Sequence, residues 1–179
     1  MARSLSVADG ASRLVAQKLA YLAQQAGAPL QLAFAKAQYG PYAEELNHVL
    51  QAMEGHYTVG CGDRTSPSPL AVVPVAVALA DDLIHTRPEL ANAVDRVDEL
   101  IDGLESPYGL ELLATVHYVA SFGQPPAMTP AEAADQVRAW SARKEHSSRT
   151  VTSLSPGLNS ATTGSSVGTG PDEREGPAR

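Results

Sequence analysis

The sequence predicts a mainly α protein: a single compact helical domain of about six helices with one or two short strands, followed by a disordered C-terminal tail. Two observations predict this fold class. Apolar residues recur at helical spacing through most of the first 146 residues, and the composition then changes to Ser, Thr, Gly and Pro. A chain of 179 residues is long enough for one domain with a hydrophobic core.

The domain boundaries follow from this change in composition. Residues 1–13 are a short N-terminal lead, residues 14–146 are the helical domain, and residues 147–179 are the tail. The tail has almost no large apolar residues, so it cannot bury enough surface to offset the entropy lost on ordering. We therefore expect the tail to be disordered.

Helical periodicity and proline positions define the expected helices. They cover residues 11–26, 42–54, 74–85, 87–103, 107–121 and 130–144. Prolines stand at or near the starts of five of these segments, where a helix tolerates them: Pro41, Pro74, Pro88, Pro107 and Pro130. In the segment 87–103, the side expected to be buried is marked by Leu90, Val94, Val97, Ile101 and Leu104.

Two other stretches predict short strands. In residues 29–38, Leu30, Leu32 and Phe34 alternate with small or polar residues. Residues 56–63 read HYTVGCGD, which favours a brief strand running into a glycine-rich turn.

Charge and cysteine content exclude several classes of protein. The net charge of −7 argues against a direct nucleic-acid partner, because phosphate binding needs clustered Lys and Arg. Cys61 is the single cysteine, which excludes a disulfide framework and any Cys-rich zinc module, and we interpret it as a buried or incidental thiol. The sequence shows no signal peptide and no apolar run long enough to span a bilayer, so a cytoplasmic location without membrane contact is expected.

Local motifs for catalysis or metal binding are absent from the sequence. There is no HExxH pattern, no phosphate-binding GxxxxGK[ST] loop and no GxSxG elbow. Glu44 and His48 are four residues apart on an expected helix, but no third ligand follows at suitable spacing. We therefore interpret them as a helix-surface pair and predict no catalytic, cofactor-binding or metal-binding residues.

The net negative charge of the domain comes from the segment Leu79 to Glu111. It holds nine carboxylates and two arginines, Arg87 and Arg96. One interpretation is a solvated helix face, and the other is a negative surface that meets a basic partner. The carboxylates expected to face outward beside the apolar stripe are Asp95, Asp98, Glu99, Asp102 and Glu105.

Four stretches together resemble a known family. They are KLAYLAQQAG, YGPYAEELNHVLQAMEGHY, GCGD and LIDGLESPYGLELLATVHYVA. In order and spacing, over roughly residues 14–145, they resemble the C-terminal, toxin-neutralising domain of DarG, the antitoxin of the DarT–DarG toxin–antitoxin system. The resemblance implies a module that neutralises a DarT-like DNA ADP-ribosyltransferase by occupying its single-stranded-DNA groove.

The resemblance also sets the expectations for partners and activity. Full-length DarG carries a macrodomain that removes ADP-ribose from thymidine in DNA, and residues 1–13 show none of its glycine-rich loops, so we expect no enzyme activity. The expected partners are a DarT-like toxin and, as a second one to consider, a separately encoded macrodomain. Residues 39–42 are expected to form a turn that holds the second helix against the first. The outward residues of that helix join the acidic group as predicted partner-binding residues: Glu44, Glu45 and His48.

Two alternatives remain open at this point. The chain can be part of a DNA ADP-ribosyl glycohydrolase acting on ADP-ribosylated thymidine, or a truncated and inactive remnant. The Ser/Thr/Gly-rich tail departs from the family, whose members usually continue with another apolar helical segment.

Overall fold

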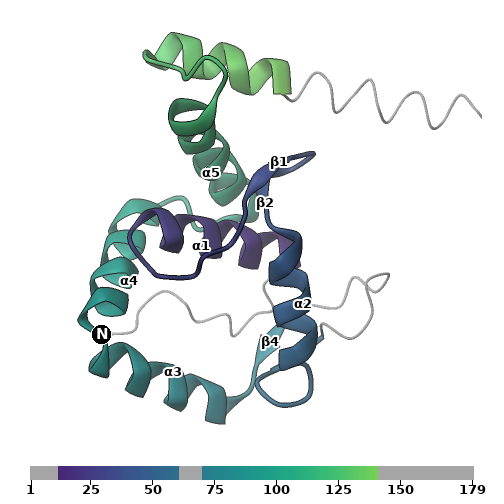
Figure 1. Ribbon diagram of the computed structural model, residues 1–179, viewed down its shortest axis with the longest axis vertical. Helices are drawn as coiled ribbons and strands as arrows, with labels where there is room; N and C mark the ends of the chain where they lie inside the picture. Colours follow the sequence, from purple (N-terminus) through teal and green to yellow (C-terminus); the bar gives the residue numbers. More distant parts are fainter. Residues whose placement is uncertain (1–11, 61–69, 141–179) are drawn as a thin grey trace, which may run out of the picture. The chain divides into compact units, whose positions relative to one another are not determined.

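The structure is a computed structural model that describes residues 12–60 and 70–140. In chain order its elements are α1 (Arg13–Gln25), β1 (Ala35–Ala37), β2 (Gly40–Tyr42), α2 (Glu44–Met53), β3 (Thr58–Val59), β4 (Ala71–Val72), α3 (Pro74–Thr86), α4 (Pro88–Ile101) and α5 (Pro107–Phe122), and residues 130–140 form a further helix (Figure 1). The prediction of a mainly α fold with six helices and short strands is confirmed for these residues. The expected tail and Cys61 lie outside them.

The four strands form two small antiparallel sheets. β1 pairs with β2, with Ala35 opposite Tyr42, and β3 pairs with β4, with Thr58 opposite Val72. Among the described residues, no helix is both long and apolar enough to cross a membrane.

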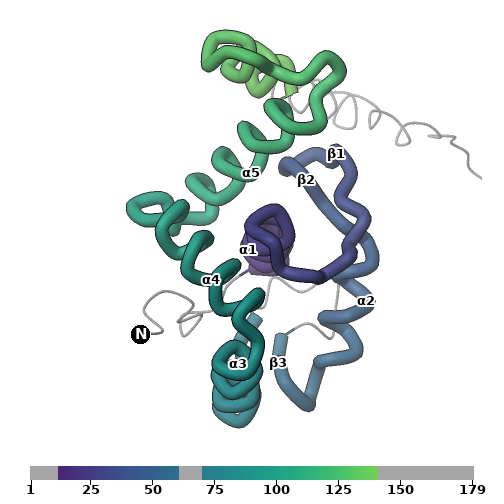
Figure 2. The backbone as a smooth tube through the Cα atoms, turned by 60° about the vertical axis from the view of Figure 1, so that its left-hand side comes forward, coloured from purple at the N-terminus to yellow at the C-terminus, as the bar shows by residue number. Residues whose placement is uncertain are grey.

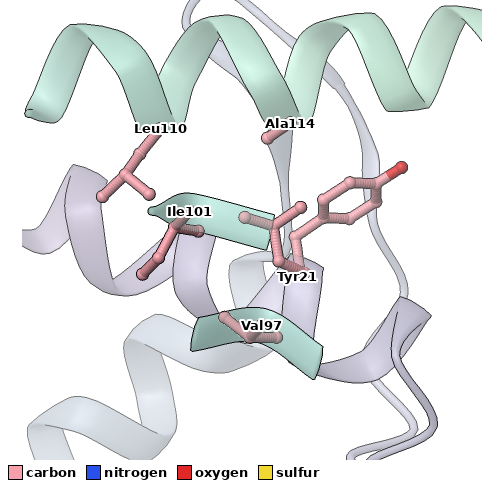
Figure 3. Packing of buried hydrophobic residues seen from close by; sticks show 6 residues of the cluster. Tyr21, Val97, Ile101, Leu110 and Ala114 are labelled. Carbon is pink, nitrogen blue, oxygen red and sulfur yellow. The ribbon is translucent and has the colours of Figure 1, made fainter. Parts of the chain in front are cut away.

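The main core forms where α1, α4 and α5 meet. Figure 2 shows α1 between α4 and α2, with α5 and β2 also beside it. The buried cluster combines residues of three helices: Tyr21 and Leu22 from α1, Val97 and Ile101 from α4, and Leu110 and Ala114 from α5 (Figure 3). Burying these side chains stabilises the fold by about 1.5–3 kcal/mol for each large apolar one.

Two smaller clusters extend the core. Leu50 of α2 packs with Leu70, and the helix 130–140 packs through Ala133 and Trp140 onto Val119 of α5. The Trp140 indole also donates a hydrogen bond of 2.8 Å to the Ala37 carbonyl, which ties this helix to β1.

Polar side chains inside the domain hold β2 against α1. Gln17 and Lys18 are 0% and 1% exposed. The Gln17 amide donates to the Ala43 carbonyl at 2.8 Å and accepts from the Ala43 N–H at 3.0 Å. Lys18 Nζ donates to the Pro41 carbonyl at 2.6 Å. These contacts fix the backbone as far as Ala43 in an extended conformation.

Three sequence predictions are wrong in this region. The second helix begins at Glu44, not at residue 42, because the backbone before it is held extended on α1. Gly40–Tyr42 is therefore a strand, and only the preceding pair 38–39 forms the hairpin turn. The first strand is confined to Ala35–Ala37.

The apolar stripe predicted for residues 87–103 is only partly buried. Val97 and Ile101 are buried in the core, whereas Leu104 is 41% exposed. The reason is that α4 ends at Ile101, and Gly103, with a φ of 78°, turns the chain before Leu104 can follow the helical face.

Burial lowers the pKa of Lys18 to about 8, while the nearby Glu111 carboxylate opposes this shift. An unfolded lysine has a pKa of 10.5, so between pH 8 and 10.5 the unfolded chain binds more protons than the folded one. The unfolding free energy should therefore rise with pH in this range. Urea unfolding of the wild type and of Lys18→Met at pH 7.5 and 9.5 checks this. Between these pH values the unfolding free energy of the wild type should rise relative to that of the variant. Parallel pH profiles would contradict it.

Candidate partner-binding surface

The exposed side of α4 carries a row of carboxylates. Asp95, Glu99 and Asp102 are exposed and follow one another at steps of four and three residues. This spacing places them on the side of the helix opposite Val97 and Ile101, which the core fixes inward. We call Asp95, Glu99 and Asp102 the acidic face.

The two other predicted carboxylates of this group behave differently. Asp98 is only partly exposed, and its Oδ1 is buried with no hydrogen-bond partner among the described residues. The expectation that Asp98 faces outward is therefore wrong, because it lies at the flank of α4 beside the buried side. Glu105 lies beyond the helix, where its Oε1 accepts from the Gly103 N–H at 3.1 Å. Its own backbone N–H and that of Gly103 lower the pKa of this carboxyl.

Neither arginine of the segment neutralises the acidic face. Arg87 lies 3.8 Å from Glu89 in an exposed ion pair. Arg96 donates at 3.1 Å to the Ala26 carbonyl, where it caps the C-terminal end of α1. The positive charges closest in sequence are thus directed away from Asp95, Glu99 and Asp102.

The predicted residues of α2 form a separate surface. Glu44, Glu45 and His48 are all exposed, while Asn47 and Leu50 face inward. Glu44 and Glu45 lie in the first turn, where the helix dipole favours negative charge. In both views of the backbone α2 and α4 lie on different sides of α1, so the structure does not bring the two predicted groups together (Figures 1 and 2).

A cavity of about 300 Å³ lies between the first turn of α1 and the start of α2. It is lined by Arg13, Leu14, Tyr42 and Asn47. The Asn47 amide donates a hydrogen bond to the Tyr42 hydroxyl. Arg13 and Asn47 were not predicted as site residues from the sequence. An asparagine on the inward side of a helix indicates a buried polar contact. In the described part of the chain, no three His, Cys, Asp or Glu side chains come together as a metal site.

His117 is partly buried beside the core residue Tyr21. Its Nδ1 lies 2.8 Å from the Tyr21 hydroxyl, and the two rings pack edge to face. Burial lowers the pKa of His117 and raises that of Tyr21. The pair is therefore a neutral hydrogen bond that joins α1 to α5, and we assign it to the scaffold.

The chain is similar to proteins that share one name. No family model matches it. A DNA ADP-ribosyl glycohydrolase of Thermus aquaticus is 46% identical over 132 residues, which is 74% of this chain and 36% of that protein. Proteins of the same name from Mycobacterium bovis and Mycobacterium tuberculosis are each 42% identical over 142 residues, 75% of this chain and 40% of theirs. The chain thus spans well under half the length of these relatives.

These relatives correct one expectation. The prediction that the chain is not an enzyme is wrong, because its relatives carry the name of an enzyme. That prediction rested on the few residues before position 14, which say nothing about a similarity that extends over three quarters of the chain. The chain is therefore related, over that part of its length, to a portion of proteins named DNA ADP-ribosyl glycohydrolase.

Proposed function

We propose that this chain binds and neutralises a DarT-like DNA ADP-ribosyltransferase, as the toxin-binding portion of a DarG-related protein. Two findings support the proposal. Four stretches of the sequence resemble the toxin-neutralising domain of DarG. The relatives are named for the removal of ADP-ribose from DNA, the modification that such a toxin attaches.

The acidic face of α4 is the observation that carries the mechanism. A groove that binds single-stranded DNA presents positive charge along its length. Asp95 and Glu99 on α4 and Asp102 at its C-terminal cap form an exposed row of negative charge, and Arg87 and Arg96 are engaged elsewhere. Such a row occupies the groove in place of phosphates and is steered there by charge.

The proposal is tested by toxin activity. A DarT-like toxin is incubated with NAD and a thymidine-containing oligonucleotide, and the full chain is added in increasing amounts. Modification should stop near one chain per toxin, because each chain covers one groove. Unchanged modification at a large excess of the chain, with no complex in size-exclusion chromatography, would refute the proposal.

A second candidate is hydrolysis of the DNA–ADP-ribose bond, which the printed name of the relatives favours. The chain is incubated with an ADP-ribosylated thymidine oligonucleotide, and released ADP-ribose is measured by chromatography. If turnover occurs, the cavity beside α2 is the first place to test. Tyr42→Phe removes one hydroxyl from its lining, the one that accepts a hydrogen bond from the Asn47 amide. Turnover equal in both proteins would exclude a role for that hydroxyl, and no release from either would remove this candidate.

A further inference from the structure

Helix α5 exposes a row of apolar side chains along its N-terminal part. Its inward residues Leu110 and Ala114 are 2% and 0% exposed. On the other side, Tyr108, Leu112 and Val116 are 74%, 37% and 37% exposed and follow one another at steps of four residues. Farther along the same side, Val119 is buried under the helix 130–140. Among the described residues, the outer side of α5 is therefore only partly covered from Tyr108 to Val116.

Leu104 extends this row toward α4. The loop that contains it lies directly against the first turn of α5, because a Cβ added at Gly109 would lie only 2.5 Å from the Leu104 carbonyl oxygen. Ser106 fixes the same turn by accepting from the Gly109 N–H at 3.0 Å. Four apolar side chains, all at least 37% exposed, lie in this loop and on the outer side of α5, and we call them the apolar ledge: Leu104, Tyr108, Leu112 and Val116. Exposed apolar patches mark interaction sites.

Carboxylates border one end of the apolar ledge. Asp102 and Glu105 flank Leu104 and are exposed. The Gly103 N–H holds the Glu105 carboxylate at this loop. Arg96 is bonded to Ala26 on α1 and Arg87 is paired with Glu89, so both arginines of the segment are engaged away from these charges. The ledge therefore offers apolar contact along its length and negative charge at the end next to the acidic face.

We propose that the apolar ledge docks a basic amphipathic helix of the partner protein. The apolar side of that helix would pack on Tyr108, Leu112 and Val116, and its Lys or Arg residues would reach Asp102 and Glu105. This inference rests on the proposed function, since Asp102 belongs to both surfaces and a toxin bound at the acidic face has its next contact here. Charge complementarity selects a basic helix over a neutral or an acidic one.

A peptide experiment tests the ledge on the full chain. The probe is a synthetic helix of Leu and Lys with Leu at helical spacing, and its counterpart has Glu at every Lys position. The ledge variant combines Tyr108→Ala, Leu112→Ala and Val116→Ala, which keep helix propensity high. The matched control, Val75→Ala with Leu79→Ala and Leu83→Ala, removes a row of the same spacing on α3 whose members are 47–60% exposed. Binding is measured by fluorescence anisotropy.

We expect the Lys peptide to bind the wild type and the α3 control alike and the ledge variant roughly tenfold or more weakly. Asp102→Asn with Glu105→Gln should weaken binding and reduce its dependence on salt. Equal losses in the ledge and control variants, or equal binding of the Lys and Glu peptides, would overturn the inference. So would a dimer of the wild type that the ledge variant abolishes, because a second copy would then be the occupant.

The same variants with a DarT-like toxin separate the two proposals. A toxin that binds the wild type and the ledge variant equally would overturn the ledge inference and leave the proposed function standing. A toxin that binds neither, together with a Lys peptide that still discriminates between the variants, would refute the proposed function and support the ledge as a site for another basic partner.

Discussion

Replacing Gly40 with alanine is expected to destabilise the domain by roughly 2–4 kcal/mol, the largest effect we predict for a single methyl group. Gly40 has a φ of 90°, and a Cβ there would lie 2.7 Å from Thr115 Oγ1 and 3.3 Å from Lys18 Nζ. The two contacts come from α5 and α1, so relief of the clash must displace β2 from both helices. Urea unfolding followed by far-ultraviolet circular dichroism measures the loss.

Gly55→Ala is the matched control for this prediction. Gly55 also has a positive φ, of 78°, but a Cβ there meets nothing within 4 Å. Its substitution should cost only the backbone strain, about 1–2 kcal/mol. Equal losses at Gly40 and Gly55 would show that the packing of β2 against α1 and α5 is looser than the distances indicate.

Neutralising the acidic face should weaken toxin binding by roughly tenfold or more while leaving the thermal midpoint nearly unchanged. The variant combines Asp95→Asn, Glu99→Gln and Asp102→Asn. Exposed charges contribute about 1 kcal/mol or less to folding, whereas close charge pairs across an interface contribute roughly 1.5–7 kcal/mol, and 1.4 kcal/mol is a factor of ten in affinity. Asp98 is left in place because its Oδ1 is buried.

The comparison variant for this prediction is Glu44→Gln with Glu45→Gln on α2, which removes negative charge from the other predicted surface. Salt should slow association of the wild type more than that of the acidic-face variant, because screening removes the steering that the variant has already lost. Normal affinity in the acidic-face variant with loss in the α2 variant would place the binding surface on α2.

The sequence was sufficient to predict the helices that begin with proline. Pro74, Pro88 and Pro107 each start a helix in the structure, because a proline fits the first turn of a helix and disrupts hydrogen bonding in its interior. It was also sufficient for most of the acidic face, since the apolar spacing around Val97 and Ile101 defines the opposite side of α4. That reasoning failed for Asp98, whose flank position the helical period does not resolve.

Other parts of the fold depend on contacts that no local pattern shows. Gln17 and Lys18 are polar residues, yet they are buried because backbone groups more than twenty positions away satisfy them. The Gln24 amide likewise bonds both the N–H and the carbonyl of Leu32, at 2.7 and 3.0 Å, so this backbone needs no sheet partner. The alternation around Leu32 therefore led to a predicted strand that begins six residues before β1, at residue 29 and not at Ala35.

The apolar ledge could not be predicted from the sequence for a different reason. Residues 107–121 were predicted as a helix, but Leu112 and Leu110 have the same side-chain chemistry, and only packing shows that Leu110 is covered. Because apolar residues lie on both the buried and the exposed side of α5, helical periodicity alone does not assign its exposed side.

Competition for the DNA groove tests the central claim most directly. A DarT-like toxin without NAD is bound to a fluorescent single-stranded oligonucleotide containing thymidine, and the full chain is added while anisotropy is followed. We predict that the chain displaces the oligonucleotide completely near one equivalent, and that the acidic-face variant needs roughly tenfold more. A stable complex that contains toxin, chain and oligonucleotide together would contradict the claim that this chain occupies the groove.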